Sequence, residues 1–301
     1  MADFHWGRNV ALDVGVVVVA HNPGERLADL CSILCPQAPV VIIDNASTSG
    51  TDILQSCVSM GAEVLRLARN TGVAGGLVEG HAHFRNREWI LTFDQDSVVG
   101  PDFLPTLAST PELSEPRVAI LGPTVVDADS GGRLQSAPSG DARFLITSGA
   151  LCRIEALDDI GGFRPELFID HVDHDVCLRL RRRGWRLRIT DEVVMHHSIG
   201  AMRDHHVIGR LSVRNSHHAA DRQYYKYRNF VLLVRDGTAL VDRRWMARVG
   251  AALSWGPLKI VLFEEAKAAK IHAVLDGVRD GLRGVTGPRP SASRSKEKDS
   301  R

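Results

Sequence analysis

Two carboxylates stand two residues apart in the segment Phe93-Asp94-Gln95-Asp96-Ser97, directly after an apolar run. Placed just beyond a strand, Asp94 and Asp96 can both approach one divalent cation. A hard cation such as Mg²⁺ prefers oxygen ligands, keeps several waters and is completed by substrate phosphates. Such a cation offsets the negative charge on a departing diphosphate. The same pair is also typical of a solvated acidic turn, so its function depends on the residues that lie near it.

A second acidic segment covers residues 170–175, where three aspartates and two histidines occur within six positions. If a helix begins near Asp173, the side chains of Asp173 and Asp175 are about 200° apart around it, so only one of them faces a given pocket. A hydroxyl that acts as a nucleophile needs a base to take its proton, and an aspartate at a helix N-terminus stays ionised. Helix capping by Asp170 or Asp173 explains the same pattern equally well.

Further polar side chains follow two other apolar runs. Asp44 ends the run at residues 40–43, and Asn70 lies shortly after the run at residues 64–67. Both can hydrogen-bond a base and a ribose. The glycine-rich turn at residues 72–76 lets backbone amides come close to a nucleotide and opens a helix N-terminus. Each feature also has an ordinary structural explanation, since Asp44 fits an Asx turn.

The elements that must position these residues alternate along the first half of the chain. Apolar, β-branched runs predict strands, and the segments between them have helical spacing. The predicted strands are residues 14–20, 40–43, 64–67 and 89–93, and the predicted helices are residues 27–34, 51–59 and 72–85. This order predicts a mostly parallel α/β sheet with helices on both faces. Ligands bind at the carboxyl ends of the strands in such sheets, which is where the polar residues fall.

The second half is less regular. Residues 118–126, 143–147 and 186–190 are predicted strands, residues 173–183 a helix, and the chain is helical from residue 223. Ile271, Val274, Leu275, Val278 and Leu282 follow the spacing of an amphipathic helix. We therefore expect an N-terminal extension (1–11), a catalytic domain (12–205), a C-terminal helical region (206–286) and a disordered tail (287–301).

Composition narrows the class of protein. A net charge of +1 over 301 residues gives no strong field for nucleic acid, so no nucleic-acid partner is expected. Five cysteines without a CxxC pair indicate reduced thiols. The first residues lack a signal-peptide pattern, and the sequence holds no uninterrupted apolar run of about 18 residues. These features predict a cytoplasmic protein.

The C-terminal helices leave several roles open. Trp245, Trp255 and Phe263, with nearby Lys and Arg residues, are compatible with core packing, with a homodimer interface, or with peripheral contact at the inner face of the cell membrane. Core packing is the default expectation.

These motifs together resemble family 2 glycosyltransferases, and within them the rhamnosyltransferase-like branch. The resemblance covers roughly residues 12 to 235 and rests on the following motifs: VVVVAHNP (16–23), VIIDNAST (41–48), RNTGVAGG (69–76), LTFDQDS (91–97), the long segment 146–180, HHSIG (196–200) and RQYYKYRN (222–229). It implies the GT-A fold, which is Rossmann-like, and an inverting single displacement. The donor is expected to be a nucleotide-diphosphate sugar, dTDP-L-rhamnose first, and the acceptor a saccharide or lipid-linked hydroxyl.

The resemblance also implies roles for individual residues. Asp173 falls on the catalytic base. The residues that bind the nucleotide sugar would be Asn22, Asp44, Asn70, Gly72 and Asp94. The metal, Mg²⁺ or Mn²⁺, would be held by Asp96 and His197. The acceptor or diphosphate side would be lined by Ser148, Gly149 and Arg228. Val176 stands where the family commonly has tryptophan.

Two other functions remain as alternatives. A nucleotidyltransferase on a similar scaffold would also use a carboxylate-bound metal, but it would normally have a glycine-rich, basic loop after the first strand, and here that turn is His21-Asn22-Pro23-Gly24. A non-catalytic protein that binds nucleotide sugars would be free to lose Asp94, Asp96 and Asp173, all of which are present.

Overall fold

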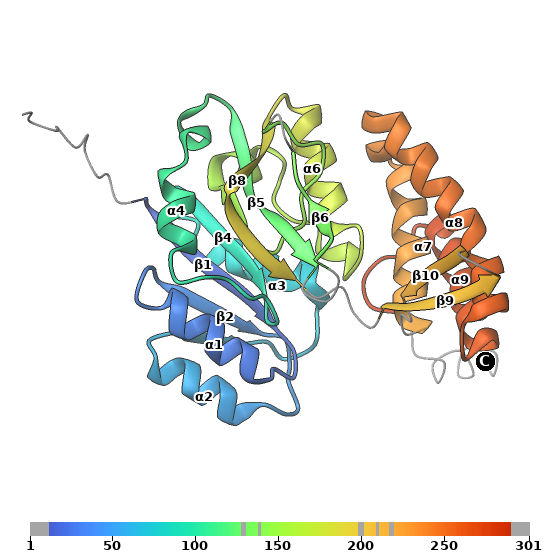
Figure 1. Cartoon of the computed structure of the whole chain (residues 1–301), viewed down its shortest axis with the longest axis horizontal. Helices are drawn as coiled ribbons and strands as arrows, with labels where there is room; N and C mark the ends of the chain where they lie inside the picture. Colours follow the sequence, from blue (N-terminus) through green and yellow to red (C-terminus); the bar gives the residue numbers. More distant parts are fainter. Residues whose placement is uncertain are drawn as a thin grey trace, which may run out of the picture.

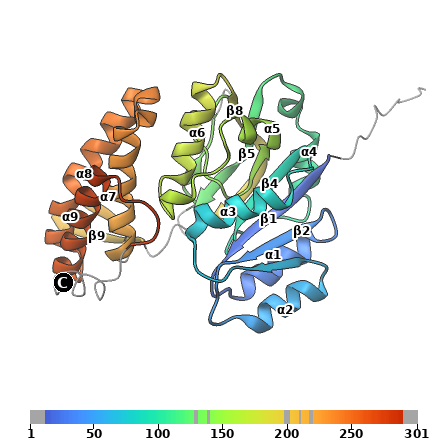
Figure 2. The ribbon, with the colours of Figure 1, turned by 180° about the vertical axis from the view of Figure 1, so that it is seen from behind.

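The structure is a computed structural model that describes residues 12–127, 131–137, 140–197, 202–208, 211–216 and 220–289. An α/β domain built on one large sheet lies beside a helical C-terminal region, and α7 faces the α/β domain (Figures 1 and 2). The predicted N-terminal extension lies outside the described residues, and the predicted tail is described only to residue 289.

The first half forms the predicted parallel sheet. Its elements are β1 (Val14–Ala20), α1 (Glu25–Leu34), β2 (Val40–Asp44), α2 (Thr51–Ser59), β3 (Glu63–Arg66), α3 (Gly72–His83) and β4 (Trp89–Asp94). The strands lie in the order β3-β2-β1-β4, and each neighbouring pair is parallel. All four carboxyl ends therefore meet at one edge, as the strand-end residues predicted.

Strand β1 shows why helices cover both faces of the sheet. Val16 and Val18 pack against α1, α2 and α4 (Phe103–Ser109) on one face. Val17 and Val19 pack against α3, α5 (Ile154–Asp159) and α6 (Val172–Arg182) on the other. Every residue of β1 is buried. A strand buried on both sides favours a continuous β-branched run over an alternating pattern.

The second half extends the sheet with β5 (Val118–Asp127), β6 (Arg133–Gln135), β7 (Ala150–Arg153) and β8 (Arg186–His197). Strand β7 lies antiparallel between β4 and β5. The strand predicted at residues 143–147 is wrong. The amide of Ile146 donates to the Gln135 side chain and that of Leu145 to the Cys177 sulfur, so side chains satisfy this backbone instead of a strand partner.

A two-stranded hairpin, β9 (Met202–Ile208) and β10 (Leu211–Ser216), precedes the helices α7 (Ala220–Arg235), α8 (Arg243–Phe263) and α9 (Lys267–Arg283). The expected start of the helical region at residue 206 therefore falls inside β9. Helix α9 approaches α7 closely, because a Cβ on Gly277 would lie 2.5 Å from the carbonyl oxygen of Tyr224.

The apolar stripe predicted on α9 is only partly buried. Val274 is buried, whereas Leu275 and Leu282 are 61% and 66% exposed. Helix α8 meets the default expectation of core packing at Trp245, which is buried, but not at Trp255, which is 63% exposed. Among the described residues, one stretch, Thr238–Phe263, is long and apolar enough to cross a membrane, and only 11% of its most apolar window is buried.

Candidate active site

The end of β1 is tied to the loop that follows β2. The Asn22 side-chain oxygen accepts hydrogen bonds from the backbone amides of Thr48 (2.7 Å) and Ser49 (3.1 Å), and the Asn22 amide donates to Ser47 Oγ (2.8 Å). Asn22, which was expected to bind the nucleotide sugar, thus lies at the carboxyl edge of the sheet, as predicted. Its side-chain oxygen, however, is already hydrogen-bonded within the protein. Its first role here is to shape the loop beside Asp44.

Asp44 ends β2 and is fully buried. Its Oδ1 accepts a hydrogen bond from the Ser47 amide (2.9 Å), and its Oδ2 lies 3.5 Å from Nε of Arg66 at the end of β3. Within the described residues, Oδ2 accepts no hydrogen bond. Asp44 therefore keeps one acceptor oxygen at the carboxyl edge of the sheet.

Asn45, which the sequence did not single out, joins β2 to the glycine turn. Its side chain accepts from the Thr71 amide (2.7 Å) and donates to the Gly72 carbonyl (2.9 Å). Asn70 forms an Asx turn, because its side-chain oxygen accepts from the Gly72 amide (2.8 Å). The Asn70 oxygen thereby fixes the start of α3. The sequence gives one signal for Asn45, which is its position directly after Asp44 at the end of the strand.

Gly72 brings the acidic segment to this edge. Its φ is +73°, and a Cβ there would lie 2.2 Å from the Phe168 carbonyl oxygen. That same carbonyl accepts a hydrogen bond from the Ala74 amide (3.0 Å). Only glycine permits this close approach. The glycine turn therefore seats the segment that leads into Asp173, a role in addition to the predicted contact with nucleotide.

The Asp94–Ser97 turn lies beside the end of β1. Gln95 accepts a hydrogen bond from the His21 amide (2.7 Å) and donates to the His21 carbonyl (3.2 Å). Asp94 is half-buried and Asp96 is exposed. Gln95 thus fixes the turn against the sheet and leaves the Asp96 carboxylate accessible to solvent.

Ser148 and Gly149 lie beneath this turn. Ser148 is buried, and its Oγ is 2.5 Å from Ser97 Oγ and accepts from the Asp94 amide (3.3 Å). Gly149 is also buried, with φ +73° and its amide donating to the Thr92 carbonyl (2.7 Å). In this structure Ser148 is bonded to the acidic turn and Gly149 to strand β4, and both are buried rather than open to solvent at the acceptor or diphosphate side.

The end of β8 reaches the same turn. His196 and Val98 exchange backbone hydrogen bonds of 3.2 and 3.4 Å, so the chain at His197 passes next to the acidic turn. The side chain of His197, expected to hold metal, lies outside the described residues.

Asp173 and Asp175 lie in the first turn of α6 and have different surroundings. Asp175 is fully buried and forms ion pairs with Arg179 (2.5 Å) and Arg164 (3.2 Å), so its role is structural. Asp173 is partly exposed, and its Oδ1 accepts from His174 Nδ1 (2.9 Å). Burial raises the pKa of Asp173, but His174 lowers it more, to about 2. Asp173 is therefore ionised at any physiological pH.

An aromatic cluster surrounds His174. The centroid of its ring lies 5.0 Å from that of Trp245 in α8, 5.2 Å from that of Phe144 and 5.3 Å from that of His171. His171 is buried with neither ring nitrogen hydrogen-bonded within the described residues, and burial lowers its pKa to about 4. The C-terminal region thus contributes Trp245 to the surroundings of Asp173, a contact that no local sequence pattern signalled.

Arg222 of α7 is where the carboxylates from separate segments meet. Its guanidinium lies 3.1 Å from Asp170 Oδ1. Burial lowers the pKa of Arg222, but Asp170, and with it Asp94 and Asp173, raise it above its usual value. Because the coulombic influence of a charge falls with distance, Asp94 and Asp173 lie near enough to Arg222 to favour its charged form. The β4 turn, the acidic segment and α7 therefore surround a common site.

Arg228, one turn and a half further along α7, does not lie where it was expected. It is fully buried, and its guanidinium donates to the carbonyls of Glu166, Leu167 and Gly287 and to the Asn229 side chain. A guanidinium whose N–H groups are used in this way has no role at an open diphosphate site. Arg222, from the same motif, is the arginine that faces the aspartates.

Within the described part of the chain, no three His, Cys, Asp or Glu side chains gather closely enough to hold a metal ion alone. The donors at the β4 turn are two carboxylates, Asp94 and Asp96, and Asp96 is open to solvent. This donor set fits Mg²⁺ or Mn²⁺ bound by one or two carboxylates and completed by substrate phosphates.

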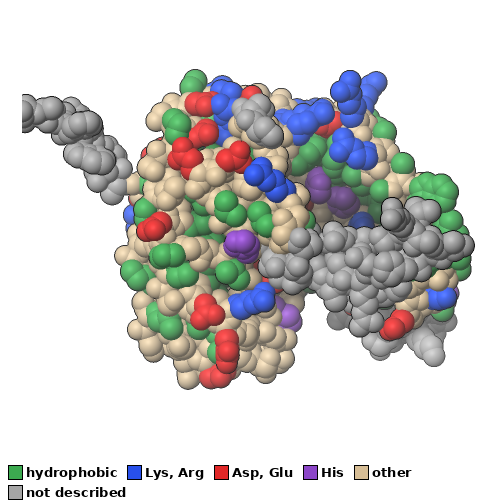
Figure 3. Space-filling model, in the orientation of Figure 1, with side chains coloured by type: hydrophobic (Ala, Val, Ile, Leu, Met, Phe, Trp, Pro, Cys, Tyr) green, Lys and Arg blue, Asp and Glu red, His purple; other side chains and the backbone are tan. Residues whose placement is uncertain are grey.

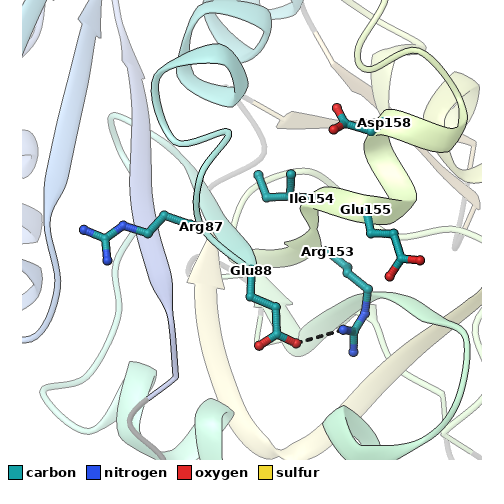
Figure 4. A pocket seen from close by; sticks show the side chains of 6 residues that line it. All are labelled: Arg87, Glu88, Arg153, Ile154, Glu155 and Asp158. Atoms are coloured by element: carbon teal, nitrogen blue, oxygen red, sulfur yellow. Dashed lines mark hydrogen bonds and ion pairs between the residues drawn. The ribbon is translucent and has the colours of Figure 1, made fainter.

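Two pockets in the described residues lie away from this edge. One, of about 380 Å³, sits at the amino end of β4 and is lined by Arg87, Glu88 and residues 153–155 and 158 (Figure 4). Its Arg153 and Glu88 pair with each other (2.8 Å). The other, of about 440 Å³, is lined by Ile160, Arg179, Arg182 and Arg183. Neither includes a strand-end aspartate, so the site rests on the converging residues and not on a closed cavity.

Comparison with known proteins agrees with this geometry. The family described as "Glycosyl transferase family 2" matches residues 15–164, which run from β1 through the acidic turn and end before the acidic segment. The dTDP-rhamnosyl transferase RfbF of Shigella flexneri is 27% identical over 299 residues, covering 91% of this chain and 97% of its own length.

Two solved structures share the fold. Residues 1–349 of S. aureus TarS in complex with UDP-GlcNAc match with a TM-score of 0.57 at 14% identity, over 91% of this chain and 82% of that one. GalNAc-T7 with UDP, GalNAc and Mn²⁺ matches with a TM-score of 0.57 at 13% identity, over 92% of this chain and 57% of that one. The chain thus spans a little over half of the GalNAc-T7 chain and has the GT-A fold of these enzymes. The strand-end aspartates, the fold and the family match together identify the chain as a glycosyltransferase of family 2, similar to rhamnosyltransferases.

Proposed function

We propose that the chain transfers L-rhamnose from dTDP-L-rhamnose to a saccharide or lipid-linked hydroxyl, with inversion at the anomeric carbon. The observation that carries the proposal is that Arg222 pairs with Asp170, while Asp94 and Asp173, from separate segments, favour its charged form. The similarity to a dTDP-rhamnosyl transferase over nearly its whole length supports the choice of sugar.

The donor would lie across the carboxyl edge of β2, β1 and β4. Asp44, whose Oδ2 accepts no hydrogen bond among the described residues, and the Asn70–Gly72 turn would bind the nucleoside. Asp94 would face the ribose or the diphosphate. Helix α3, which is 12 residues long, directs the positive end of its dipole toward a bound anion. The amides of Gly72 and Ala74 are already bonded to Asn70 and Phe168.

Asp173 would act as the general base. The acceptor oxygen attacks the anomeric carbon, the bond from that carbon to the diphosphate oxygen breaks, and the acceptor proton passes to Asp173. Both hydrogen bonds from His174 reach Asp173 Oδ1, which leaves Oδ2 to take the proton. The low pKa keeps Asp173 ready in its basic form, and His174 sets its orientation.

Asp96 and His197 would hold Mg²⁺ or Mn²⁺, with Asp94 next to Asp96 on the side of the donor. When bound, the cation would neutralise the charge that develops on the leaving diphosphate. Arg222 would add a second positive charge on the side of α7. Release of the nucleoside diphosphate would then depend on both.

The first experiment is donor turnover by the purified full chain. We expect release of dTDP from dTDP-L-rhamnose with Mg²⁺ or Mn²⁺, and little release with EDTA. The same donor should raise the melting temperature more than UDP-glucose does, because a ligand that binds only the native state stabilises it in proportion to its affinity. Release of pyrophosphate from a nucleoside triphosphate, without dTDP release, would favour the nucleotidyltransferase instead.

The Asp173→Asn variant tests the base. We expect sugar transfer to fall by about 10² to 10⁴-fold, while the thermal shift caused by dTDP stays as in the wild type. Asp175→Asn is not a suitable control because Asp175 is a buried ion pair; Asp52→Asn, on the exposed start of α2, is. An Asp173→Asn enzyme with near wild-type turnover would remove Asp173 from this role.

A further inference from the structure

Helix α8 presents an exposed stripe along its outer side. Residues 244, 248, 251, 255, 258 and 262 are all exposed, and their spacing of four and three places them within about 40° of one line on the helix. The stripe changes character along the axis. Arg244 and Arg248 are basic at its N-terminal end, and Trp255, Leu258 and Leu262 are apolar at its other end, with 63%, 46% and 56% of their surfaces exposed.

The opposite side of α8 is packed on the protein. Trp245, Leu253 and Ile260 are buried against α7 and α9. Tyr227 of α7 donates a hydrogen bond to the Leu253 carbonyl (2.7 Å). One face of the helix therefore packs against the rest of the protein, and the other face has no protein partner among the described residues.

The charges on α8 indicate what covers the exposed stripe. Arg243, Arg244, Arg248 and Lys259 are basic, and the helix contains no acidic residue. The acidic residues next to it are Asp242, which is buried and paired with Arg143 and Arg181, Glu264, which is buried against Lys270 (2.6 Å), and Glu265, which is exposed. Figure 3 shows the same separation, with Lys and Arg side chains at the upper end of the C-terminal region and hydrophobic side chains along its outer edge. A basic and apolar helix face complements a lipid surface with anionic headgroups.

We propose that the α8 stripe docks on an anionic membrane surface, with α8 lying in the interface. Arg244 and Arg248 would meet the headgroups, and Trp255 would sit at the boundary between headgroups and acyl chains. A 21-residue helix is about 31 Å long, enough to cross a bilayer. A crossing would expose the packed face, break the Tyr227 hydrogen bond and bury several basic side chains, so the helix lies on the membrane.

The orientation of α8 links this surface to the candidate site. Its first turn carries Trp245, whose ring lies 5.0 Å from His174, the partner of Asp173. The basic end of the stripe thus begins beside the candidate base. A membrane under the stripe would hold a lipid-linked acceptor near Asp173. The docking proposal depends only on the surface of α8, so it does not rest on the proposed sugar transfer.

Vesicle flotation of the full chain tests the proposal. We expect the wild type to float with vesicles of phosphatidylcholine and phosphatidylglycerol, to float weakly with phosphatidylcholine alone, and to be released by high salt. Each Lys or Arg near an anionic surface strengthens partitioning by roughly fivefold. Arg244→Glu with Arg248→Glu should therefore lower partitioning at least about tenfold, and Trp255→Asp with Leu262→Asp should abolish it.

The control is Val58→Asp on α2, whose side chain is 53% exposed on the α/β domain; its partitioning should match the wild type. All variants replace exposed residues, and unchanged melting temperatures would verify their folds. Equal flotation of the wild type and the stripe variants overturns the proposal. So does a wild-type dimer that the stripe variants convert to monomer, which would assign the stripe to a second copy. Resistance of the wild type to carbonate extraction overturns it in favour of a spanning helix.

Discussion

At the residue scale, the acidic segment separates one structural aspartate from one reactive aspartate. Asp175 is paired with two arginines, whereas Asp173 is partly exposed and hydrogen-bonded by a histidine. Burial lowers the pKa of His174, but Asp173 and Asp170 raise it above its usual value. The protonated His174 and the Asp173 carboxylate therefore stabilise each other, and His174 is a positioning residue for the proposed base.

Replacing His174 by Phe keeps the ring packing on Trp245 and Phe144 but removes the charge and the hydrogen bond. Without His174, the pKa of Asp173 rises from about 2 toward its ordinary value, so the acid limb of kcat/KM should move to higher pH. We expect kcat to fall by roughly 10 to 100-fold because the carboxylate loses its orientation, with the KM for the donor unchanged.

The wild type should also show an ionisation, above the usual pKa of histidine, that His174→Phe lacks. Because the pKa of His174 is raised, the imidazolium loses its proton only as the pH rises through that raised pKa, and the ion pair with Asp173 is then lost. His272→Phe, an exposed position on α9, is the control. Identical pH profiles for wild type and His174→Phe would mean that the ring only packs.

At the element scale, close contact between α9 and α7 positions α7 beside the site. Gly277 and Gly281, one turn apart on α9, lie against the backbone of α7, because Cβ atoms there would come within 2.5 Å of the Tyr224 carbonyl and 2.8 Å of the Arg228 carbonyl. Small residues at this spacing let two helix backbones approach. The position of Arg222 on α7 therefore depends on glycines in α9.

Gly277→Ala tests this dependence. The added methyl group must push α9 away from a rigid backbone oxygen, and overpacking of this kind costs about 1 to 3 kcal/mol. We expect a lower urea midpoint and reduced donor turnover. Gly250→Ala in α8 is the matched control, because its Cβ would meet only Phe230 at 3.5 Å, and helix propensity should make it neutral or slightly stabilising. Equal stabilities of the two variants would contradict the argument.

At the scale of the whole molecule, the C-terminal region fixes the conformation of the acidic segment. Asn229 of α7 donates to the carbonyls of Leu167, Ile169 and Asp170, each at 2.8 Å. Within that segment Phe168, Asp170 and His171 have φ values of +62° to +64°. Non-glycine residues in this region are strained and persist only where their surroundings hold them. Helix α7 therefore holds the strained segment that presents Asp173.

Asn229→Leu should release that segment. The substitution removes the donor of the Ile169 and Asp170 carbonyls, while the Leu167 carbonyl keeps its hydrogen bond from Arg228. Each buried unsatisfied group costs about 1 to 3 kcal/mol. We expect a loss of at least about 2 kcal/mol in the free energy of unfolding, measured by urea denaturation, together with a larger loss in kcat than in affinity for dTDP. Asn86→Leu, on the exposed surface, serves as the control. Wild-type turnover by Asn229→Leu would show that the segment keeps its shape without α7.

The sequence by itself determined the parallel half of the sheet, because buried β-branched runs and short turns report directly on local backbone structure. Because the carboxyl ends of parallel strands lie at one edge of the sheet, the sequence also predicted that Asp44, Asn70 and Asp94 share that edge. The strand predicted at residues 143–147 failed because Gln135 and Cys177, distant in sequence, satisfy its amides.

Only the tertiary structure decided which basic and aromatic residues complete the site. Arg222 and Arg228 belong to one motif, yet one faces the aspartates and the other is buried among carbonyls. Trp245 reaches His174, and Trp255 remains exposed, although both lie on α8. Spacing along a helix says which residues share a face, but which face meets which neighbour depends on how distant segments pack, and that information is not local.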